Sequence, residues 1–131
     1  MTITMLYAGA LALVLLVLSV RVTQARGQEK VYMGDGGNAL VLRRMRGQAN
    51  FVEYVPITLL LVAFLELRGA PAWELHALLG TLLIARLLHA YTFAFATFFM
   101  PGRFGGAVLS WAVLGVSAVL CIWQGFKALS P

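Results

Sequence analysis

The chain has 131 residues, of which 61% are hydrophobic and only 11% are charged, so a water-soluble domain of this size cannot bury its apolar surface. The formal net charge of +5 does not indicate nucleic-acid binding, because six of the ten basic residues lie together between the first two apolar segments. The single cysteine, Cys121, excludes an internal disulfide and is interpreted as a small buried hydrophobic residue.

Four apolar segments predict four membrane-spanning helices in a single domain, residues 1–131. The predicted helices are about 3–21, 38–67, 72–99 and 103–129. Segments of about 20 residues or more match a hydrocarbon core about 30 Å thick. A barrel would require alternating strands of about ten residues, which the sequence lacks. The predicted fold class is therefore all-α, a polytopic membrane four-helix bundle.

The boundaries of these segments carry local signals. The first segment is interpreted as a retained helix, because a cleaved signal peptide has its basic residues before the apolar run, whereas Arg21 follows it. Asn38 is predicted to be the N-cap of the second helix. The glycines before it lack the strand and the lysine of a phosphate-binding loop. The sequence Met100-Pro101-Gly102 is predicted to end the third helix and separate it from the fourth.

The loops indicate the orientation in the membrane. The first loop carries most of the cations and the third carries Arg103, whereas Glu66, Arg68 and Glu74 nearly balance the second. The positive-inside rule therefore places the first and third loops in the cytosol and both termini on the non-cytosolic side. The sequence predicts a multi-pass integral membrane protein.

Ionisable residues interrupt two of the helices at one depth, where each needs a partner or a function. Counted from Glu66 along a helix, Glu53 lies about 20 Å deep and Arg46 about 30 Å deep. Counted from Glu74, Arg86 lies about 18 Å deep on the third helix. We therefore expect a polar layer in the cytosolic half of the bilayer.

The spacing of these residues is helical. Arg46, Asn50 and Glu53 are separated by four and three residues and share one stripe, and Arg86 and His89 share a face of the third helix. A pocket between these two faces would offer cations, an amide, a carboxylate and an imidazole. This combination suits a small zwitterionic ligand that has several carboxylates and an amine.

Structural roles stay open for some of these residues. Glu53 and Arg86 are explained equally well as a buried ion pair between two helices. Arg43 falls on the stripe of Arg46 one turn earlier, but Arg43 and Arg44 are interpreted as lipid-headgroup anchors. No metal site is predicted, because His89 lacks the second histidine or acid that a metal would require.

The run RGQANFVEYVP, from Arg46 to Pro56, resembles the Arg-x-x-x-Asn-x-x-Glu-x-x-Pro signature of the MAPEG family, the membrane-associated proteins in eicosanoid and glutathione metabolism. The chain length, the four helices, Arg86-x-x-His89 and an arginine that opens the fourth helix agree with this resemblance. It covers essentially the whole chain and is closest to the small bacterial members. It therefore implies a place in the bacterial inner membrane.

The resemblance implies a glutathione-dependent transferase or peroxidase that forms homotrimers, with glutathione or a similar thiol as co-substrate between neighbouring subunits. Arg103 matches the arginine credited with activating the thiol. No metal is implied. The implied glutathione contacts are Arg46, Gln48, Asn50, Glu53, Tyr54, Arg86 and His89, with Arg21 or Arg26 as a basic contact at the end of the first helix.

One position departs from the family pattern. Relatives often place a tyrosine four residues after the position of His89, and this chain has Phe93 there. Tyr91 is offset by about 160° on the helix and cannot supply the same hydroxyl. A polar contact to glutathione is therefore missing, and the sequence does not support a specific eicosanoid synthase.

The expected chemistry depends on the protonation of a thiol. A thiol becomes a nucleophile when it loses its proton, and a nearby positive charge lowers its pKa. Arg103 and the N-terminus of the fourth helix supply positive charge at one place. The second substrate is expected to be an apolar electrophile or hydroperoxide that arrives from the membrane lipid.

Two other classes of function remain as alternatives. One is a non-enzymatic lipid-binding scaffold of the same family. The other is a small membrane exporter. It is less favoured, because such exporters resemble one another in having a membrane-embedded glutamate in the first helix, and the first predicted helix here has no acid. For the assembly, Gly102, Gly106 and Ser110 recur every four residues and allow helices to approach closely, either between subunits or within one.

Overall fold

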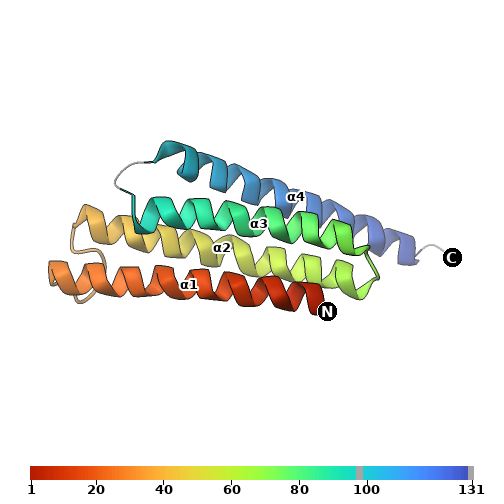
Figure 1. The fold of residues 1–131 in the computed structure, drawn as a ribbon, viewed down its shortest axis with the longest axis horizontal. Coiled ribbons are helices and arrows are strands. Elements are labelled where there is room, and N and C mark those ends of the chain that lie inside the picture. The colour runs from red at the N-terminus through yellow and green to blue at the C-terminus, as the bar shows by residue number, and fades with distance from the viewer. Residues whose placement is uncertain (97–98, 130–131) are drawn as a thin grey trace.

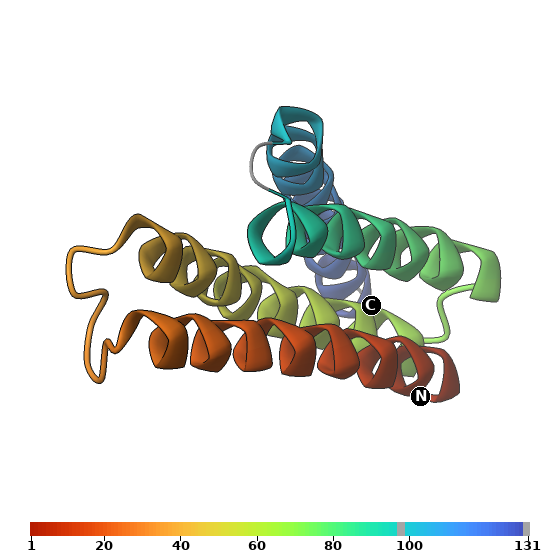
Figure 2. The ribbon, with the colours of Figure 1, turned by 60° about the vertical axis from the view of Figure 1, so that its left-hand side comes forward.

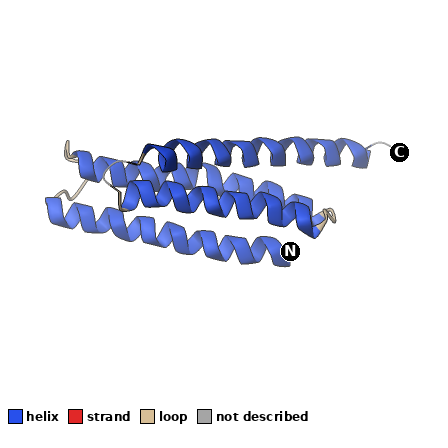
Figure 3. Cartoon of the chain, turned by 45° about the horizontal axis from the view of Figure 1, so that its top comes forward, coloured by secondary structure: helices blue, strands red, loops and turns tan. Residues whose placement is uncertain are grey.

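The computed structural model describes residues 1–96 and 99–129, which form four long helices joined by short connections (Figure 1). No strand occurs in these two ranges, as Figure 3 shows, and all four helices are long and apolar enough to cross a membrane. The predicted all-α polytopic four-helix bundle is confirmed. The helices are α1 (Thr2–Glu29), α2 (Ala39–Leu67), α3 (Ala72–Ala94) and α4 (Met100–Leu129).

The four helices are not equivalent in their packing. α2 and α3 each contact all the other helices, whereas α4 packs mainly on α3 and, within the described ranges, does not contact α1. Figure 2 shows α4 standing apart from the layer that α1 and α2 form. The buried core runs along the inner faces of α2 and α3, with Leu79, Leu82 and Val62 fully enclosed. The outer faces remain apolar, as lipid requires.

The first helix is longer than predicted. It continues from residue 21 to Glu29, because Val22 and Ala25 still bury their side chains against the bundle. It ends where Lys30 adopts a left-handed conformation with φ of 56°. Glu29 therefore belongs to α1, contrary to the expectation of a first helix without an acid, but it lies at the last position.

The connection between α1 and α2 confirms one local prediction. Asn38 is the N-cap of α2, and its side-chain oxygen accepts hydrogen bonds from the backbone N–H groups of Leu40 and Val41. The side-chain N–H2 group of Asn38 also donates to Glu29 at 2.7 Å. This bond explains why Glu29 faces the loop rather than the membrane interior.

The break between α3 and α4 comes earlier than predicted. α3 ends at Ala94 instead of residue 99, and α4 begins at Met100 instead of residue 103. Pro101 stands in the first turn of α4, where a helix needs no N–H donor, so this proline starts a helix and does not break one. Residues 97–98 of the predicted third helix lie outside the described residues.

The opposite end of the bundle is tied by Glu66 near the end of α2. Its two carboxylate oxygens accept hydrogen bonds from the backbone N–H groups of Ile3 and Thr4, at 3.0 and 2.8 Å. The terminal amine of Met1 lies 3.7 Å away. This long-range cap keeps the start of α1 level with the end of α2.

The small-residue stripe of α4 packs inside one chain. Gly102, Gly106 and Ser110 are all buried, and a Cβ atom on Gly106 would lie 2.7 Å from the carbonyl oxygen of Ala85 and 2.9 Å from Cβ of His89. Of the two explanations for the stripe, the packing of α4 on α3 is therefore the one observed. The close approach also brings the start of α4 next to His89.

Candidate functional site

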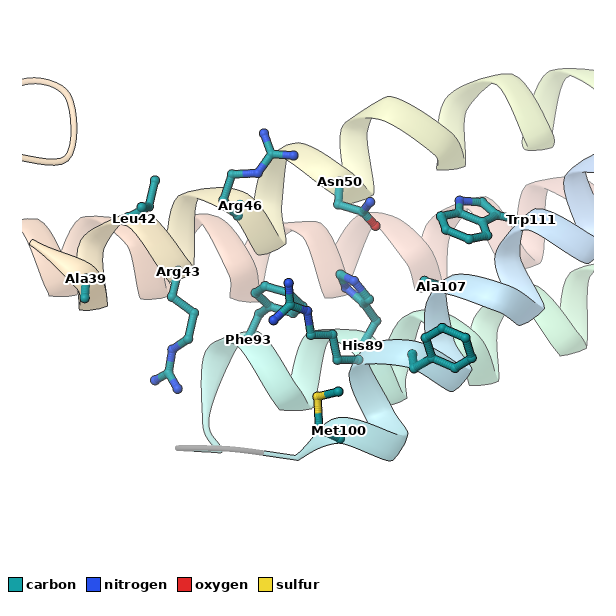
Figure 4. A pocket seen from close by; sticks show the side chains of 12 residues that line it. Ala39, Leu42, Arg43, Arg46, Asn50, His89, Phe93, Met100, Ala107 and Trp111 are labelled. Atoms are coloured by element: carbon teal, nitrogen blue, oxygen red, sulfur yellow. The ribbon is translucent and has the colours of Figure 1, made fainter.

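A pocket of about 740 Å³ lies between the first half of α2, the end of α3 and the start of α4 (Figure 4). None of its lining residues is acidic, and three are arginines. Its fixed charge is therefore positive, which favours an anionic ligand. The lining residues are Ala39, Leu42, Arg43, Arg46, Asn50, His89, Phe93, Met100, Arg103, Phe104, Ala107 and Trp111.

The α2 wall of the pocket contains the predicted stripe. Arg46 is exposed and Asn50 is half-buried one turn later. The amide oxygen of Asn50 accepts a hydrogen bond of 2.9 Å from Nη1 of Arg86, which is only 1% exposed. Because the amide oxygen is used in this bond, the amide N–H2 group of Asn50 is the part of the side chain that can donate to a ligand. Arg86 does not line the pocket, and it acts on the site through Asn50.

The α3 and α4 walls are built around one aromatic stack. His89 is 4% exposed and stacks on Phe93 with the ring centroids 4.5 Å apart. Both side chains are labelled in Figure 4. Cζ of Arg103 lies 5.8 Å from the centroid of the Phe93 ring, within the range of a cation–π interaction. At the position where relatives have a tyrosine, the chain thus keeps the ring under Arg103 and lacks the hydroxyl group.

Arg103 lies in the first turn of α4, where its backbone N–H is already bonded to the carbonyl oxygen of Phe99 at 3.2 Å. The contribution of this helix end to the positive charge therefore comes from the earlier residues Met100 and Gly102, since Pro101 has no N–H group. The side chain of Arg103 is exposed and contributes the larger part of the charge.

Two predicted site residues of α2 point elsewhere in this single chain. Glu53 is exposed and does not line the pocket, and in the described part of the chain it forms no ion pair with Arg86. The alternative of a buried Glu53–Arg86 pair is therefore wrong, and Asn50 occupies the place of the acid. Tyr54 packs on Trp111, with the ring centroids 6.4 Å apart, and under Arg86.

The structure does not bring three further predicted contacts to the pocket. Nε of Arg21 donates to the carbonyl oxygen of Ala94 at 3.0 Å. Gln48 donates to the hydroxyl group of Ser19 at 2.8 Å, which joins α2 to α1. Arg26 donates to the sulfur of Met45 at 3.5 Å. These side chains connect helices within one chain.

Sequence reasoning missed part of the lining. Arg43 was interpreted as a headgroup anchor, yet it lines the pocket and donates from Nη1 to the carbonyl oxygen of Ala96 at 2.7 Å. Phe104, Ala107 and Trp111 form the apolar wall. Successive members of this set are separated by three and four residues, which places them on one face of a helix, and that signal was available in the sequence.

No group of three or more histidine, cysteine, aspartate or glutamate side chains comes together in the described ranges. The prediction that no metal binds stays a prediction.

Comparisons with known proteins agree with the resemblance found in the sequence. The MAPEG family model matches residues 4–123. The chain is 35% identical to the inner membrane protein YecN of Escherichia coli strain K12 over 121 residues, which are 92% of this chain and 91% of that protein. The protein of the same name from Escherichia coli O6:H1 gives the same values. No solved structure matches the chain significantly.

These matches extend over nearly the whole chain and include the residues of the pocket on α2, α3 and α4. Together with the four apolar helices, they confirm the prediction of a multi-pass integral membrane protein of the bacterial inner membrane. The chain belongs to the MAPEG family.

Proposed function

We propose that this protein is a glutathione-dependent transferase or peroxidase, and that the pocket holds glutathione or a similar thiol. The family includes glutathione transferases. The observation that carries the proposal is a pocket in which Arg43, Arg46 and Arg103 meet Asn50 and His89 without an acid. Its volume lies within the range of roughly 300–1,000 Å³ that is usual for small-molecule sites.

Glutathione has two carboxylates, one amine and a thiol, and the pocket offers groups that match the carboxylates and the thiol. Arg43 and Arg46 would bind the carboxylates through charge-assisted hydrogen bonds, and the amide N–H2 group of Asn50 would donate to a carbonyl or carboxylate oxygen. The thiol would then lie at the α4 side of the pocket, beside Arg103. The positive charge of Arg103 stabilises the thiolate and lowers the pKa of the bound thiol.

The apolar wall of the pocket suits the second substrate. Phe104 and Trp111 are exposed at the outer surface of α4, where lipid is expected. An apolar electrophile would arrive from the bilayer and lie against these rings. In a substitution, the thiolate sulfur forms a bond to the electrophilic carbon, and the leaving group departs with the bonding electron pair. In a peroxidase reaction, the thiolate attacks the distal oxygen of the hydroperoxide, the O–O bond breaks, and the alkoxide leaves and takes up a proton to become the alcohol. The sulfenic acid that forms then condenses with a second thiol to give the disulfide and water.

The exposed charges of α2 support assembly into a homotrimer. The side chain of Glu53, about 20 Å from Glu66 along the helix, faces out of the subunit at a depth where an ionised group in lipid is costly. A neighbouring subunit that covers this face removes the cost and places Glu53 where it can bind the amine of glutathione. Arg21, Arg26 and Gln48 remain proposed contacts, which requires each to exchange its present partner for the ligand.

The test is a calorimetric titration of detergent-purified protein with glutathione and with S-methylglutathione, followed by turnover with an aryl halide and with an organic hydroperoxide. We expect both ligands to bind and only glutathione to support turnover. Binding without turnover with either second substrate would favour the scaffold alternative. Absence of binding by both ligands would contradict the proposal.

A further inference from the structure

Three arginines gather at the C-terminal end of α3, beside the pocket but largely outside it. We call Arg21 of α1 and Arg43 and Arg44 of α2 the arginine cluster. Arg21 and Arg43 donate to the carbonyl oxygens of Ala94 and Ala96, at 3.0 and 2.7 Å. Both guanidinium groups lie close enough to Arg44 for electrostatic repulsion.

Arg44, interpreted from the sequence as a lipid-headgroup anchor, is only 9% exposed. Its Nε and Nη1 atoms are fully buried and have no hydrogen-bond partner among the described residues. A buried guanidinium group without partners is costly, because both its charge and its donors have lost water. Among the described residues no group compensates for these two buried donors, which leaves them available to a ligand.

Neither Arg21 nor Arg44 forms an ion pair with a carboxylate of the described residues. In residues 1–96 and 99–129 the one ion pair is that of the Met1 amine with Glu66, at the other end of the bundle. The acids of the first loop are engaged elsewhere, Glu29 with Asn38 and Asp35 with the backbone N–H of Gly37. The C-terminal dipole of α3 offers only about half a negative charge against three positive charges.

The arginine cluster lies at the level of lipid headgroups. Arg44 is about 33 Å from Glu66 along α2, and Ala94 is about 30 Å from Glu74 along α3. The hydrocarbon core is about 30 Å thick, so these atoms reach its far boundary. Basic pockets between membrane helices at this level are typical sites for anionic phospholipid headgroups.

We propose that the arginine cluster binds the phosphate of one anionic phospholipid, such as phosphatidylglycerol, in the leaflet at this end of the bundle. The phosphate would accept hydrogen bonds from the buried donors of Arg44 and from Arg21, and Arg43 would add its positive charge. A lipid suits the site better than a soluble anion, because its acyl chains remain in the bilayer beside α1 and α2 while the headgroup reaches the guanidinium groups.

This lipid site is centred on Arg44, which does not line the pocket, although Arg43 lines the pocket and Arg21 is also a proposed glutathione contact. The cluster holds the end of α3, and the next helix begins with the turn that carries Arg103. An anionic lipid bound there stabilises the end of α3 against which the start of α4 packs.

The test uses the full chain in neutral detergent micelles, doped with phosphatidylglycerol or with phosphatidylcholine of the same acyl chains. Thermal unfolding is followed by tryptophan fluorescence, and native mass spectrometry counts retained lipids. We expect phosphatidylglycerol, but not phosphatidylcholine, to raise the Tm. We expect Arg44→Gln to weaken phosphatidylglycerol binding roughly fivefold, as the loss of one cation near a headgroup implies.

The variants separate a lipid site from a structural role. Without anionic lipid, Arg44→Gln should unfold at the wild-type Tm or above it, because the substitution removes an unbalanced buried charge. The matched control is Arg68→Gln, which removes an exposed arginine at the opposite end and should leave the phosphatidylglycerol effect intact. Arg21→Gln should reduce the effect as Arg44→Gln does, and it serves if Arg44→Gln does not fold.

Three outcomes would overturn the inference. Equal shifts with both lipids would mean ordinary solvation by the bilayer. A shift with inorganic phosphate as large as that with phosphatidylglycerol would mean a site for soluble anions. A shift that depends on Arg44 with glutathione, and that phosphatidylglycerol does not produce, would assign the cluster to the thiol site.

Discussion

Asn50 of α2 and Arg86 of α3 are joined by a hydrogen bond of 2.9 Å at the back of the pocket, and this bond determines how the amide faces a ligand. Asn50→Leu removes the acceptor and leaves the buried guanidinium group without its partner. We expect the free energy of unfolding to fall by about 1.5–3 kcal/mol. Asn50→Asp keeps an acceptor and should preserve the fold, but its charge should weaken the binding of an anionic thiol.

Chemical unfolding in detergent and calorimetric binding separate these two effects. Tyr7→Phe is the control, because it removes another side-chain bond between helices, that of the Tyr7 hydroxyl group with Nδ1 of His76, away from the pocket. The role of Asn50 is refuted if Asn50→Asp binds the thiol as tightly as the wild type.

Gly106 is a close contact of α4 with α3, and its neighbour Gly105 provides a matched control. A Cβ atom on Gly106 would meet the backbone of Ala85 and the side chain of His89, whereas one on Gly105 would meet nothing within 4 Å. Gly106→Ala should therefore destabilise the protein by about 1–3 kcal/mol. Gly105→Ala should be neutral or slightly stabilising, because alanine favours a helix. Thermal unfolding of both variants checks the difference, and equal Tm values would contradict the packing described here.

Phe93 occupies the position of the family tyrosine, so Phe93→Tyr restores the missing hydroxyl group at the edge of the pocket. If the ligand reaches this position as proposed, the new hydrogen bond should strengthen thiol binding by about 0.5–1.5 kcal/mol. Phe93→Leu removes the ring under Arg103 and should weaken binding instead. Calorimetry with glutathione measures both, and an increase in affinity from both substitutions would argue against this geometry.

Glu53 is exposed in the single chain, so its charge is not needed for the fold of one subunit. Glu53→Gln should leave the Tm nearly unchanged while thiol affinity and trimer formation decrease. Native mass spectrometry reports assembly, and calorimetry reports affinity. Glu74→Gln, at the start of α3, is the control. A large loss of Tm with normal affinity would mean that Glu53 is structural.

The parts of the site that follow from helical spacing were predictable. Arg46 and Asn50 are four residues apart, and counting from Glu66 and Glu74 placed them at the level of Arg86 and His89. The structure brings Arg46, Asn50 and His89 together in one pocket with Arg103.

The rest depends on contacts between distant residues, which one sequence does not reveal. The helical rotation that turns Glu53 outward and Asn50 toward Arg86 is set by how α2 packs on α3. Gln48 donates a hydrogen bond to Ser19 on α1, and Arg21 donates one to the carbonyl oxygen of Ala94 on α3. Neither partner is near in sequence. The predicted ends of the helices were also wrong where polar residues continue a helix beyond its apolar part, as in residues 22–29 of α1.

The central claim is that the charge of Arg103 lowers the pKa of the bound thiol. The most direct measurement is a titration of thiolate absorbance with glutathione bound, in wild type, Arg103→Ala and Arg103→Lys. Arg103→Ala should raise the pKa of the bound thiol by about 1–3 units, each worth about 1.4 kcal/mol, and turnover should fall more than affinity.

Arg103→Lys should retain part of the effect, because it keeps the charge and loses the planar guanidinium group. Arg68→Ala, at the opposite end of the bundle, should leave the thiol pKa unchanged. A bound thiol in Arg103→Ala with the pKa and turnover of the wild type would contradict the account.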